Sequence, residues 1–245
     1  MSHPPMLLSI ILGIVAALAD VVGGMILVRR EWPQHYLRYF VALGAGFMMA
    51  VAFLEMVPDS LKFQSQWEPV LVLAGYCAIH LLEHTITPHF HFGEETHGHE
   101  FVSAHTGNSV LAGLAAHALF DGVAIGSGFV LSNLLGWLIF IAIFLHKMPE
   151  GFTVASVMMA SGRSRRTALI SAIVLAMATV IGVLLISLLP GWVEVGLPLS
   201  AGVAIYVAAT DLVPEVNREP GIRMALVFFA GVGLFLAIKL LAPQL

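Results

Sequence analysis

Long apolar stretches dominate the chain, and they limit its fold more than any other feature. Eight windows are each long enough to cross a bilayer, which takes ~20 mostly apolar residues. They cover about residues 6–28, 37–58, 69–87, 109–131, 134–160, 167–189, 193–214 and 222–241. The apolar stretches are continuous instead of alternating with polar residues, which favours helices over barrel strands. We therefore predict an all-α membrane protein with eight transmembrane helices, forming a single polytopic membrane domain over residues 1–245.

The composition agrees with a lipid bilayer as the surroundings of the chain. Only 11% of the 245 residues are charged, which is too few for the surface of a soluble domain of this size. The net charge of −4 and the lack of a large basic patch argue against a nucleic-acid partner. The single cysteine, Cys77, excludes an intramolecular disulfide. No basic segment precedes the first window, so it is interpreted as a membrane helix rather than a cleavable signal peptide.

The arginines are concentrated in alternate loops and so predict an orientation. Loops 1, 3, 5 and 7 and the residues beside them hold Arg29, Arg30, Arg38, Arg163, Arg165, Arg166, Arg218 and Arg223. The other loops hold only Lys62, and the C-terminal tail follows Lys239. Because cytoplasmic loops carry an excess of Lys and Arg, the odd-numbered loops should be cytoplasmic and both termini outside. Loop 3, about residues 88–108, is then cytoplasmic as well.

An internal repeat relates the second window to the seventh. Residues 45–59 align without gaps on residues 201–215, with six identities and a shared acid-x-Val-Pro-acid ending. The two windows cross the membrane in opposite directions, which predicts an inverted repeat of windows 1–3 and 6–8 around a central pair, windows 4 and 5. Such repeats are typical of transporters whose substrate site lies near the midplane.

The repeat also places a pair of acids toward each end of the bundle. Glu55 and Asp59 should lie near the outer mouth, and Asp211 and Glu215 near the cytoplasmic mouth. One hypothesis is that these pairs form the entrance and the exit for a cation. The alternative is that they are solvated helix ends.

Two short motifs carry most of the functional information. His117 and Asp121 lie at i and i+4 in the fourth window, and His146 and Glu150 have the same spacing in the fifth. On a helix the two residues of each pair share one face. A short loop between windows 4 and 5 makes them antiparallel neighbours, which should bring the two pairs together near the midplane. Two imidazoles and two carboxylates suit Zn²⁺, Fe²⁺, Mn²⁺ or Cd²⁺, whereas Ca²⁺ and Mg²⁺ prefer oxygen ligands alone. A lone histidine here would more simply form an interhelical hydrogen bond; the paired motifs favour a metal site.

With these motifs the chain resembles the ZIP family of divalent metal transporters. The resemblance rests on His117-x-x-x-Asp121-Gly122 and His146-x-x-Pro149-Glu150-Gly151, together with eight windows and a histidine-rich loop. It implies a transporter rather than an enzyme, carrying zinc or iron into the cytoplasm across the plasma (inner) membrane. It also implies that the motif histidines and acids bind the metal, and that windows 1, 4, 5 and 6 move as an elevator against windows 2, 3, 7 and 8. A homodimer is possible.

The chain departs from the family pattern next to both histidines. Many members use the residues that follow these histidines to hold a second metal, but here those positions are Ala118 and Lys147. A site for one metal ion is therefore the better prediction. Lys147 should pair with Asp121 or Glu150, because an unpaired lysine at the midplane costs about 2.5–3.5 kcal/mol. Our hypothesis is that its ammonium replaces the second cation and weakens the site; a purely structural ion pair is the alternative.

Further histidines suggest weaker metal contacts. Loop 3 contains His89, His91, His97, His99 and His105, and such a tract either binds zinc weakly or is a solvated linker. His80 and His84 lie one turn apart near the cytoplasmic end of the third window, where an exit role and simple helix packing are equally reasonable. Asp20, within the first window, either tunes the site or hydrogen-bonds to a neighbouring helix.

Three other functions are compatible with parts of this pattern. An intramembrane zinc-dependent hydrolase could use His117, Asp121 and His146 as ligands and Glu150 as the base, but the sequence contains no His-Glu-x-x-His motif. Cation-diffusion exporters also use His-x-x-x-Asp, with six spans and a soluble domain that this chain does not show. A purely structural metal site is the third possibility. The preferred ion and any proton coupling stay open.

Overall fold

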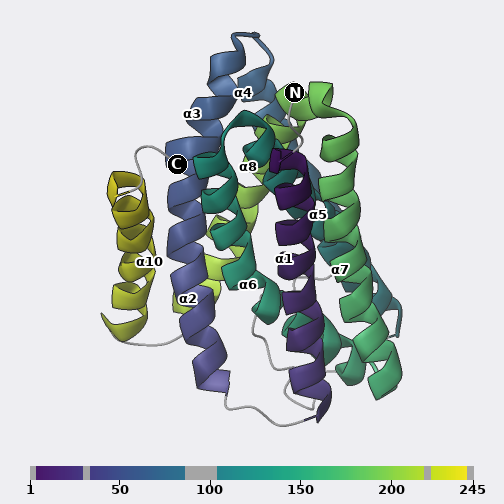
Figure 1. Cartoon of the computed structure of the whole chain (residues 1–245). Helices are drawn as coiled ribbons and strands as arrows, with labels where there is room; N and C mark the ends of the chain where they lie inside the picture. The colour runs from purple at the N-terminus through teal and green to yellow at the C-terminus, as the bar shows by residue number, and fades with distance from the viewer. Residues whose placement is uncertain (1–3, 30–33, 86–103, 218–221, 242–245) are drawn as a thin grey trace.

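The computed structural model describes residues 4–29, 34–85, 104–217 and 222–241, and in these ranges every regular element is a helix, without a strand (Figure 1). The elements are α1 (Pro4–Arg29), α2 (Gln34–Val51), η1 (Ala52–Met56), α3 (Val57–Ser60), η2 (Leu61–Phe63), α4 (Glu68–Thr85), α5 (Ala104–Leu131), α6 (Asn133–Ala160), α7 (Arg165–Leu188), η3 (Pro190–Trp192), α8 (Val193–Tyr206), η4 (Val207–Leu212), α9 (Val213–Asn217) and α10 (Ile222–Leu241). The predicted all-α class is confirmed.

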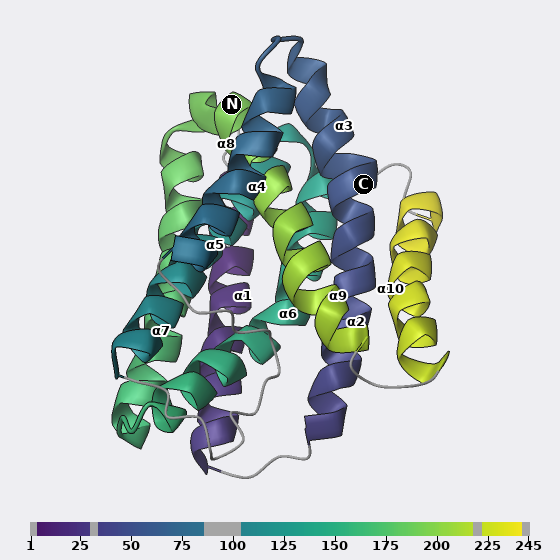
Figure 2. The same ribbon diagram turned by 180° about the vertical axis from the view of Figure 1, so that it is seen from behind.

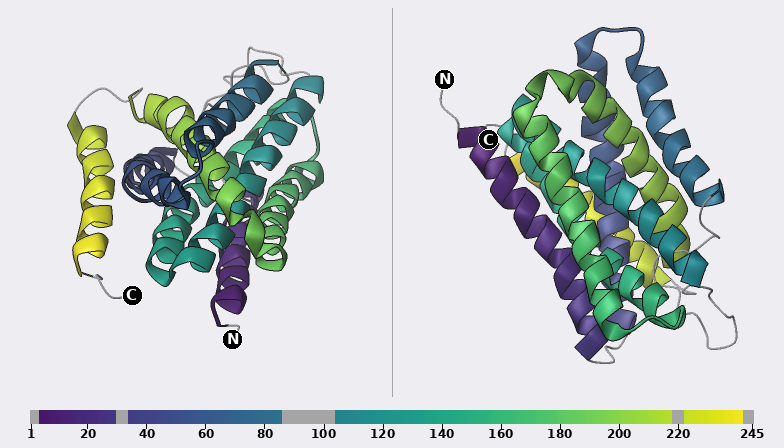
Figure 3. Two further views of the ribbon diagram at one scale, coloured as in Figure 1. Left: turned by 90° about the horizontal axis from the view of Figure 1, so that it is seen from above. Right: turned by 90° about the vertical axis from the view of Figure 1, so that its right-hand side faces the viewer.

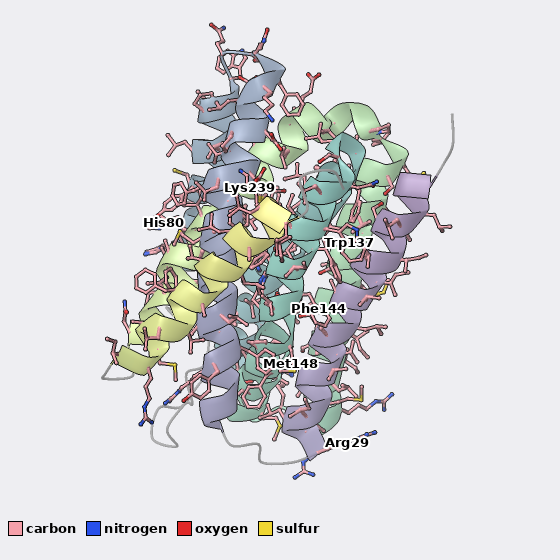
Figure 4. All side chains as sticks on the ribbon, turned by 60° about the vertical axis from the view of Figure 1, so that its left-hand side comes forward. Arg29, His80, Trp137, Phe144, Met148 and Lys239 are labelled. Atoms are coloured by element: carbon pink, nitrogen blue, oxygen red, sulfur yellow. The ribbon has the colours of Figure 1, made fainter. Side chains whose placement is uncertain are left out.

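Seven helical stretches in the described ranges are long and apolar enough to cross a membrane. They are Met6–Arg29, Arg38–Phe63, Gly107–Leu131, Asn133–Ala160, Arg165–Leu188, Pro190–Leu212 and Ile222–Leu241. Helix α4 covers most of the remaining predicted window but is not among the seven, since Glu83 and two histidines near its end lower its hydropathy. The first turn of α1 and the last turn of α10 lie at the same end of the bundle, as an even number of crossings requires (Figure 1). Arg29 lies at the opposite end (Figure 4).

The turns between the central helices have clear local causes. Helix α5 ends at Leu131 and α6 begins at Asn133, so only Ser132 separates them. The Ser132 side chain accepts a hydrogen bond from the Leu135 backbone N–H at 3.1 Å, which caps the free first turn of α6. After α6, Gly162 adopts a φ of 77°, a left-handed conformation that favours glycine and ends the helix. The one-residue link at Ser132 makes α5 and α6 close neighbours, and the turn at Gly162 leads from α6 to α7.

Both copies of the sequence repeat contain a π-helical segment at the same place. It covers Ala52–Met56 in one copy and Val207–Leu212 in the other, just before Pro58 and Pro214. Proline has no backbone N–H and its ring clashes with the carbonyl four residues earlier, so the helix must change its hydrogen-bonding register there. The local backbone therefore repeats together with the sequence.

Close backbone contacts extend the repeat well beyond the aligned residues. A methyl group placed on Gly46 would lie 2.0 Å from the Phe228 carbonyl oxygen, and one on Gly202 would lie 1.9 Å from that of Val72. Both members of the second contact are 156 residues from their counterparts in the first. The same offset relates two further contacts, Gly75 with the Leu199 carbonyl and Gly231 with the Leu43 carbonyl, at 2.0 and 2.2 Å. Thus α2 packs on α10 as α8 packs on α4.

A second set of glycine contacts joins α1 to α6 and α7 to α5. A methyl group on Gly151 would lie 2.0 Å from the Asp20 carbonyl oxygen, and one on Gly122 would lie 2.0 Å from that of Thr179. Gly23 meets the Met148 carbonyl and Gly182 meets the Leu119 carbonyl, each at 2.1 Å. Equivalent positions in these contacts differ by 159 in residue number between α1 and α7, and by 29 between α5 and α6. Two-fold pseudosymmetry therefore extends through the centre of the protein.

The eight glycine contacts join the helices in four pairs, α1 with α6, α5 with α7, α2 with α10 and α4 with α8, and we sort these pairs into two groups. We call α1, α5, α6 and α7 the site group, and α2, α4, α8 and α10 the flanking group. In the described residues, each of these eight contacts lies within one group. The groups touch mainly where α2 meets α6 and α5 meets α8. Figure 2 shows α4 and α8 from behind, and the view from above shows α10 at the edge beside α2 (Figure 3).

Helix α10 offers a matched test of these contacts. Gly231→Ala should lower the melting temperature, because overpacking against the Leu43 carbonyl costs about 1–3 kcal/mol. Gly233→Ala, two residues along, should leave it unchanged or raise it slightly, because nothing lies within 4 Å of that position. Thermal unfolding of the purified protein in detergent compares the two variants, and equal melting temperatures would contradict the close contact.

Candidate metal centre

The structure brings together the four side chains of the two motifs. One ligand atom from each of His117, Asp121, His146 and Glu150 lies within 4.8 Å of the others, and all four residues are buried. The first two come from α5 and the last two from α6. The 29-residue offset of the glycine contacts also relates His117 to His146 and Asp121 to Glu150, so the cluster lies across the pseudosymmetry of the central pair. Each acid is followed by a glycine that packs against α7 or α1.

Asp121 lies between the two imidazole rings. Its Oδ2 atom is 3.1 Å from His117 Nε2 and 3.3 Å from His146 Nε2, and the ring centroids are 5.6 Å apart. His146 Nδ1 lies 2.9 Å from the Ala142 carbonyl oxygen. When Nδ1–H donates to that carbonyl, Nε2 carries its lone pair toward Asp121. Two electron-rich atoms face each other in this way only when a cation, a proton or a metal ion, lies between them.

Several polar atoms of the cluster lack ordinary partners. Within the described part of the chain, Nδ1 of His117 and Oε1 of Glu150 are buried without a partner, and Nε2 of His117 faces Asp121 Oδ2. Leaving such a group unpaired typically costs about 1–3 kcal/mol, so an unpaired buried group needs an explanation. A bound divalent cation would be a partner for Oε1 of Glu150 and for one ring nitrogen of His117, and the donor set of two imidazoles and two carboxylates fits zinc and its neighbours among the transition metals.

Lys147 and Asp20 surround the cluster with further buried charge. Lys147 Nζ lies 2.9 Å from Asp121 Oδ2 and 2.7 Å from Glu150 Oε2, which confirms that the lysine pairs with these acids. It also lies 3.6 Å from Oδ2 of Asp20 on α1, an interaction that the motifs did not indicate. Both the Lys147 and the Asp20 side chains are 0% exposed. Asp20 is the one charged residue of window 1, and Lys147 is the one basic residue of window 5 at a similar depth, a signal that could have paired them from the sequence.

The two acids predicted at the outer mouth lie next to lysines. Glu55 Oε1 is 2.6 Å from Lys239 Nζ of α10, and Asp59 pairs with Lys62 (Figure 4 labels Lys239). They are not part of the central cluster. Their lysine partners reduce the negative charge that would attract a cation at this end.

The residues predicted at the other end form a separate arrangement. Asp211 is buried in the π-helical segment of the second repeat and interacts electrostatically with Glu83 and His117. Glu83 accepts a 2.8 Å hydrogen bond from the Tyr206 hydroxyl. His80 and His84 are exposed, and their ring centroids are 3.9 Å apart. Glu215 lies in α9, outside the residues whose side chains are described.

The histidine-rich loop is mostly outside the described residues. His89, His91, His97 and His99 fall in that region. His105 was predicted to lie in the loop, but α5 begins at Ala104, so its backbone is already helical. The apolar stretch of α5 that is long enough to cross a membrane begins at Gly107, close to the predicted start at about 109, and the helix itself begins three residues earlier.

The fold and the site together define a class: a multi-pass helical membrane protein with a buried His/Asp/Glu centre suited to a divalent metal ion. Comparison with known families gives the particular family. The model of the ZIP zinc transporter family matches residues 4–110 and 102–239. The chain belongs to the ZIP family, whose members are transporters rather than enzymes.

Individual relatives agree with this assignment. The chain is 31% identical to zinc transporter ZIP9 of Micropogonias undulatus over 160 residues, which cover 60% of this chain and 51% of that protein. It is 32% identical to zinc transporter SLC39A7 of Mus musculus over 123 residues, 44% of this chain and 25% of the relative. The human SLC39A7 protein gives the same identity over 123 residues. The matched regions thus span about half or less of these curated relatives.

Proposed function

We propose that the protein carries divalent transition metal ions, Zn²⁺ first among them, across the membrane into the cytoplasm. The observation that carries this proposal is the buried cluster of His117, Asp121, His146 and Glu150, which has the donors and the spacing for one such ion. The relatives are named zinc transporters, which supports Zn²⁺ as the substrate. The same donors also suit Fe²⁺, Mn²⁺ and Cd²⁺.

The site holds one metal ion at a time. Ala118 packs in an apolar cluster with Val154, Ala172 and Leu175, so it offers no ligand for a second ion. The Lys147 ammonium bridges Asp121 and Glu150 on the other side, where a second cation would otherwise bind. A cation held there by the chain competes for the same carboxylate oxygens as the substrate. It thereby lowers the affinity of the site and favours release of the metal.

An elevator-type movement is supported by the way the two helix groups pack. Within each of the four pairs, glycines bring backbones so close that the two helices should move as a unit, and in the site group the two pairs also pack on each other. Between the groups, Gly44 of α2 faces Leu145 of α6 at ordinary van der Waals distance, and Gly196 of α8 meets side-chain rather than backbone atoms of Val123 and Ile186. We infer that the site group slides against the flanking group and exposes the metal to one side of the membrane and then the other.

The remaining residues are assigned to the path of the ion. Glu55 and Asp59 form the entrance after release of their lysine partners, and Asp211, Glu215, His80 and His84 line the exit. The plasma (inner) membrane is the proposed location. The arginine distribution supports an orientation with both termini outside and with the histidine-rich loop in the cytoplasm. A homodimer is part of the proposal, and the mass of the protein in detergent would test it.

Purified protein in liposomes that contain a metal-sensitive dye tests the proposal directly. We expect Zn²⁺ to enter in proportion to the amount of protein, Cd²⁺, Mn²⁺ or Fe²⁺ to compete, and Mg²⁺ to have no effect. A structural metal site or a hydrolase would bind Zn²⁺ without moving it. Binding without flux would therefore contradict transport while leaving the metal site in place.

A further inference from the structure

The two halves of the centre differ at one pair of positions. The offsets defined by the glycine contacts relate Lys147 of α6 to Ala118 of α5, and Asp20 of α1 to Thr179 of α7. In one half, therefore, a buried lysine faces a buried aspartate at 3.6 Å. In the other half, both charges are missing. The half that contains Lys147 also contains Asp20, and the half that lacks the lysine lacks the aspartate. This pairing indicates that the two residues act together.

Resting on the proposed function, we propose that Asp20 is a positioning residue of the metal site, which holds the Lys147 ammonium and offsets its charge. With both imidazoles neutral, Asp121 and Glu150 contribute −2 and Lys147 contributes +1, so the cluster without Asp20 carries −1. Adding the Asp20 carboxylate returns the total to −2, the charge that one divalent ion neutralises. Asp20 thus offsets part of the loss of affinity for divalent ions that the Lys147 ammonium would otherwise cause.

The position of Asp20 fits this role better than that of a ligand. Its Oδ2 atom lies 3.6 Å from Lys147 Nζ. Asp20 is not one of the four residues whose ligand atoms could surround an ion. Within the described residues, neither of its carboxylate oxygens has a hydrogen-bond partner, so no serine, threonine or backbone N–H competes with the ammonium for it. The Asp20 backbone is held at the same time, because its carbonyl oxygen packs against Gly151, next to Glu150.

Zn²⁺ affinity of purified variants, measured by calorimetry in detergent, tests the role of Asp20. Asp20→Asn should weaken binding by at least about tenfold, because a buried unit charge acts strongly on a divalent ion. Lys147→Met, which removes the ammonium and keeps most of the length of the side chain, should tighten binding by a similar factor. The double variant Asp20→Asn/Lys147→Met should return to within about threefold of the wild-type value, since the total charge is again −2. Thr179→Val changes the mirror position and should leave affinity unchanged.

A merely structural ion pair would give a different pattern. It would lower the melting temperature of the metal-free single variants and leave Zn²⁺ affinity alone. If Asp20→Asn does not fold, the double variant is compared with Lys147→Met, since removing both partners of a buried pair is tolerated better than removing one. Equal affinity in these two proteins, or wild-type affinity in Asp20→Asn, would overturn the role of Asp20. Wild-type protein that binds no better than His146→Ala would instead contradict the metal site itself.

Discussion

Replacing His146 with alanine should reduce Zn²⁺ affinity by more than about 100-fold and abolish uptake. Loss of an outer partner of a metal ligand typically costs about 10–100-fold, and loss of the ligand itself should cost more. His146 is the imidazole whose orientation is set by a hydrogen bond, from Nδ1 to the Ala142 carbonyl at 2.9 Å. Its removal leaves three donors around the ion and leaves the Asp121 carboxylate facing His117 and Lys147.

The measurement combines calorimetry in detergent with dye-based uptake in liposomes. His35→Ala is a suitable control, because His35 lies in the first turn of α2, outside the four-residue cluster. The control should bind and transport Zn²⁺ like the wild type. Uptake by His146→Ala at the wild-type rate would show that the ion follows another path.

Locking the two helix groups together should stop transport almost completely. A Cβ atom at Gly44 of α2 would lie 3.4 Å from the Cβ atom of Leu145 in α6, close to the spacing of a disulfide. The variant Gly44→Cys/Leu145→Cys, in a chain with Cys77→Ser, should therefore cross-link on oxidation. If the site group must slide past the flanking group, uptake falls to background in the oxidised protein and returns after reduction.

A disulfide within one group provides the matched control. A Cβ atom at Gly13 of α1 would lie 3.2 Å from the Cβ atom of Val183 in α7, and both helices belong to the site group. Oxidised Gly13→Cys/Val183→Cys should keep most of its uptake, because this bond joins helices that move together. Undiminished uptake in fully cross-linked Gly44→Cys/Leu145→Cys would rule out the sliding movement, and loss of uptake in both proteins would leave no distinction between the groups.

The sequence was a good guide wherever local pattern decides the structure. Long apolar windows predicted the helices, and the i, i+4 spacing placed each histidine on the same face as its acid. The short α5–α6 turn, with Ser132 as the cap, then brought the two motifs together. The residues of the cluster could therefore be named before the structure was known, although their roles as ligands await the experiments above.

Contacts between distant helices were much harder to predict. The pairing of Lys147 with Asp20, the Glu55–Lys239 ion pair and the Tyr206–Glu83 hydrogen bond each join helices far apart in the chain. Which face of one helix meets another depends on three-dimensional packing. The pattern of apolar residues along the sequence says little about that packing. The full repeat was hidden for the same reason: Gly75 and Gly231 occupy equivalent places in the structure, but the residues around them differ.

The glycines that follow Asp121 and Glu150 have a consequence for the hydration of the ion. Because Gly122 and Gly151 draw α7 and α1 against the backbone beside the acids, the side chains of the cluster are closed off from bulk solvent. An arriving ion must exchange its water shell for protein ligands to enter. Mg²⁺ gives up water reluctantly, whereas zinc and its neighbours accept imidazole in its place. We therefore expect the close packing of the bundle to select against Mg²⁺, the ion that gives up its water most reluctantly, before the preference of the ligands acts.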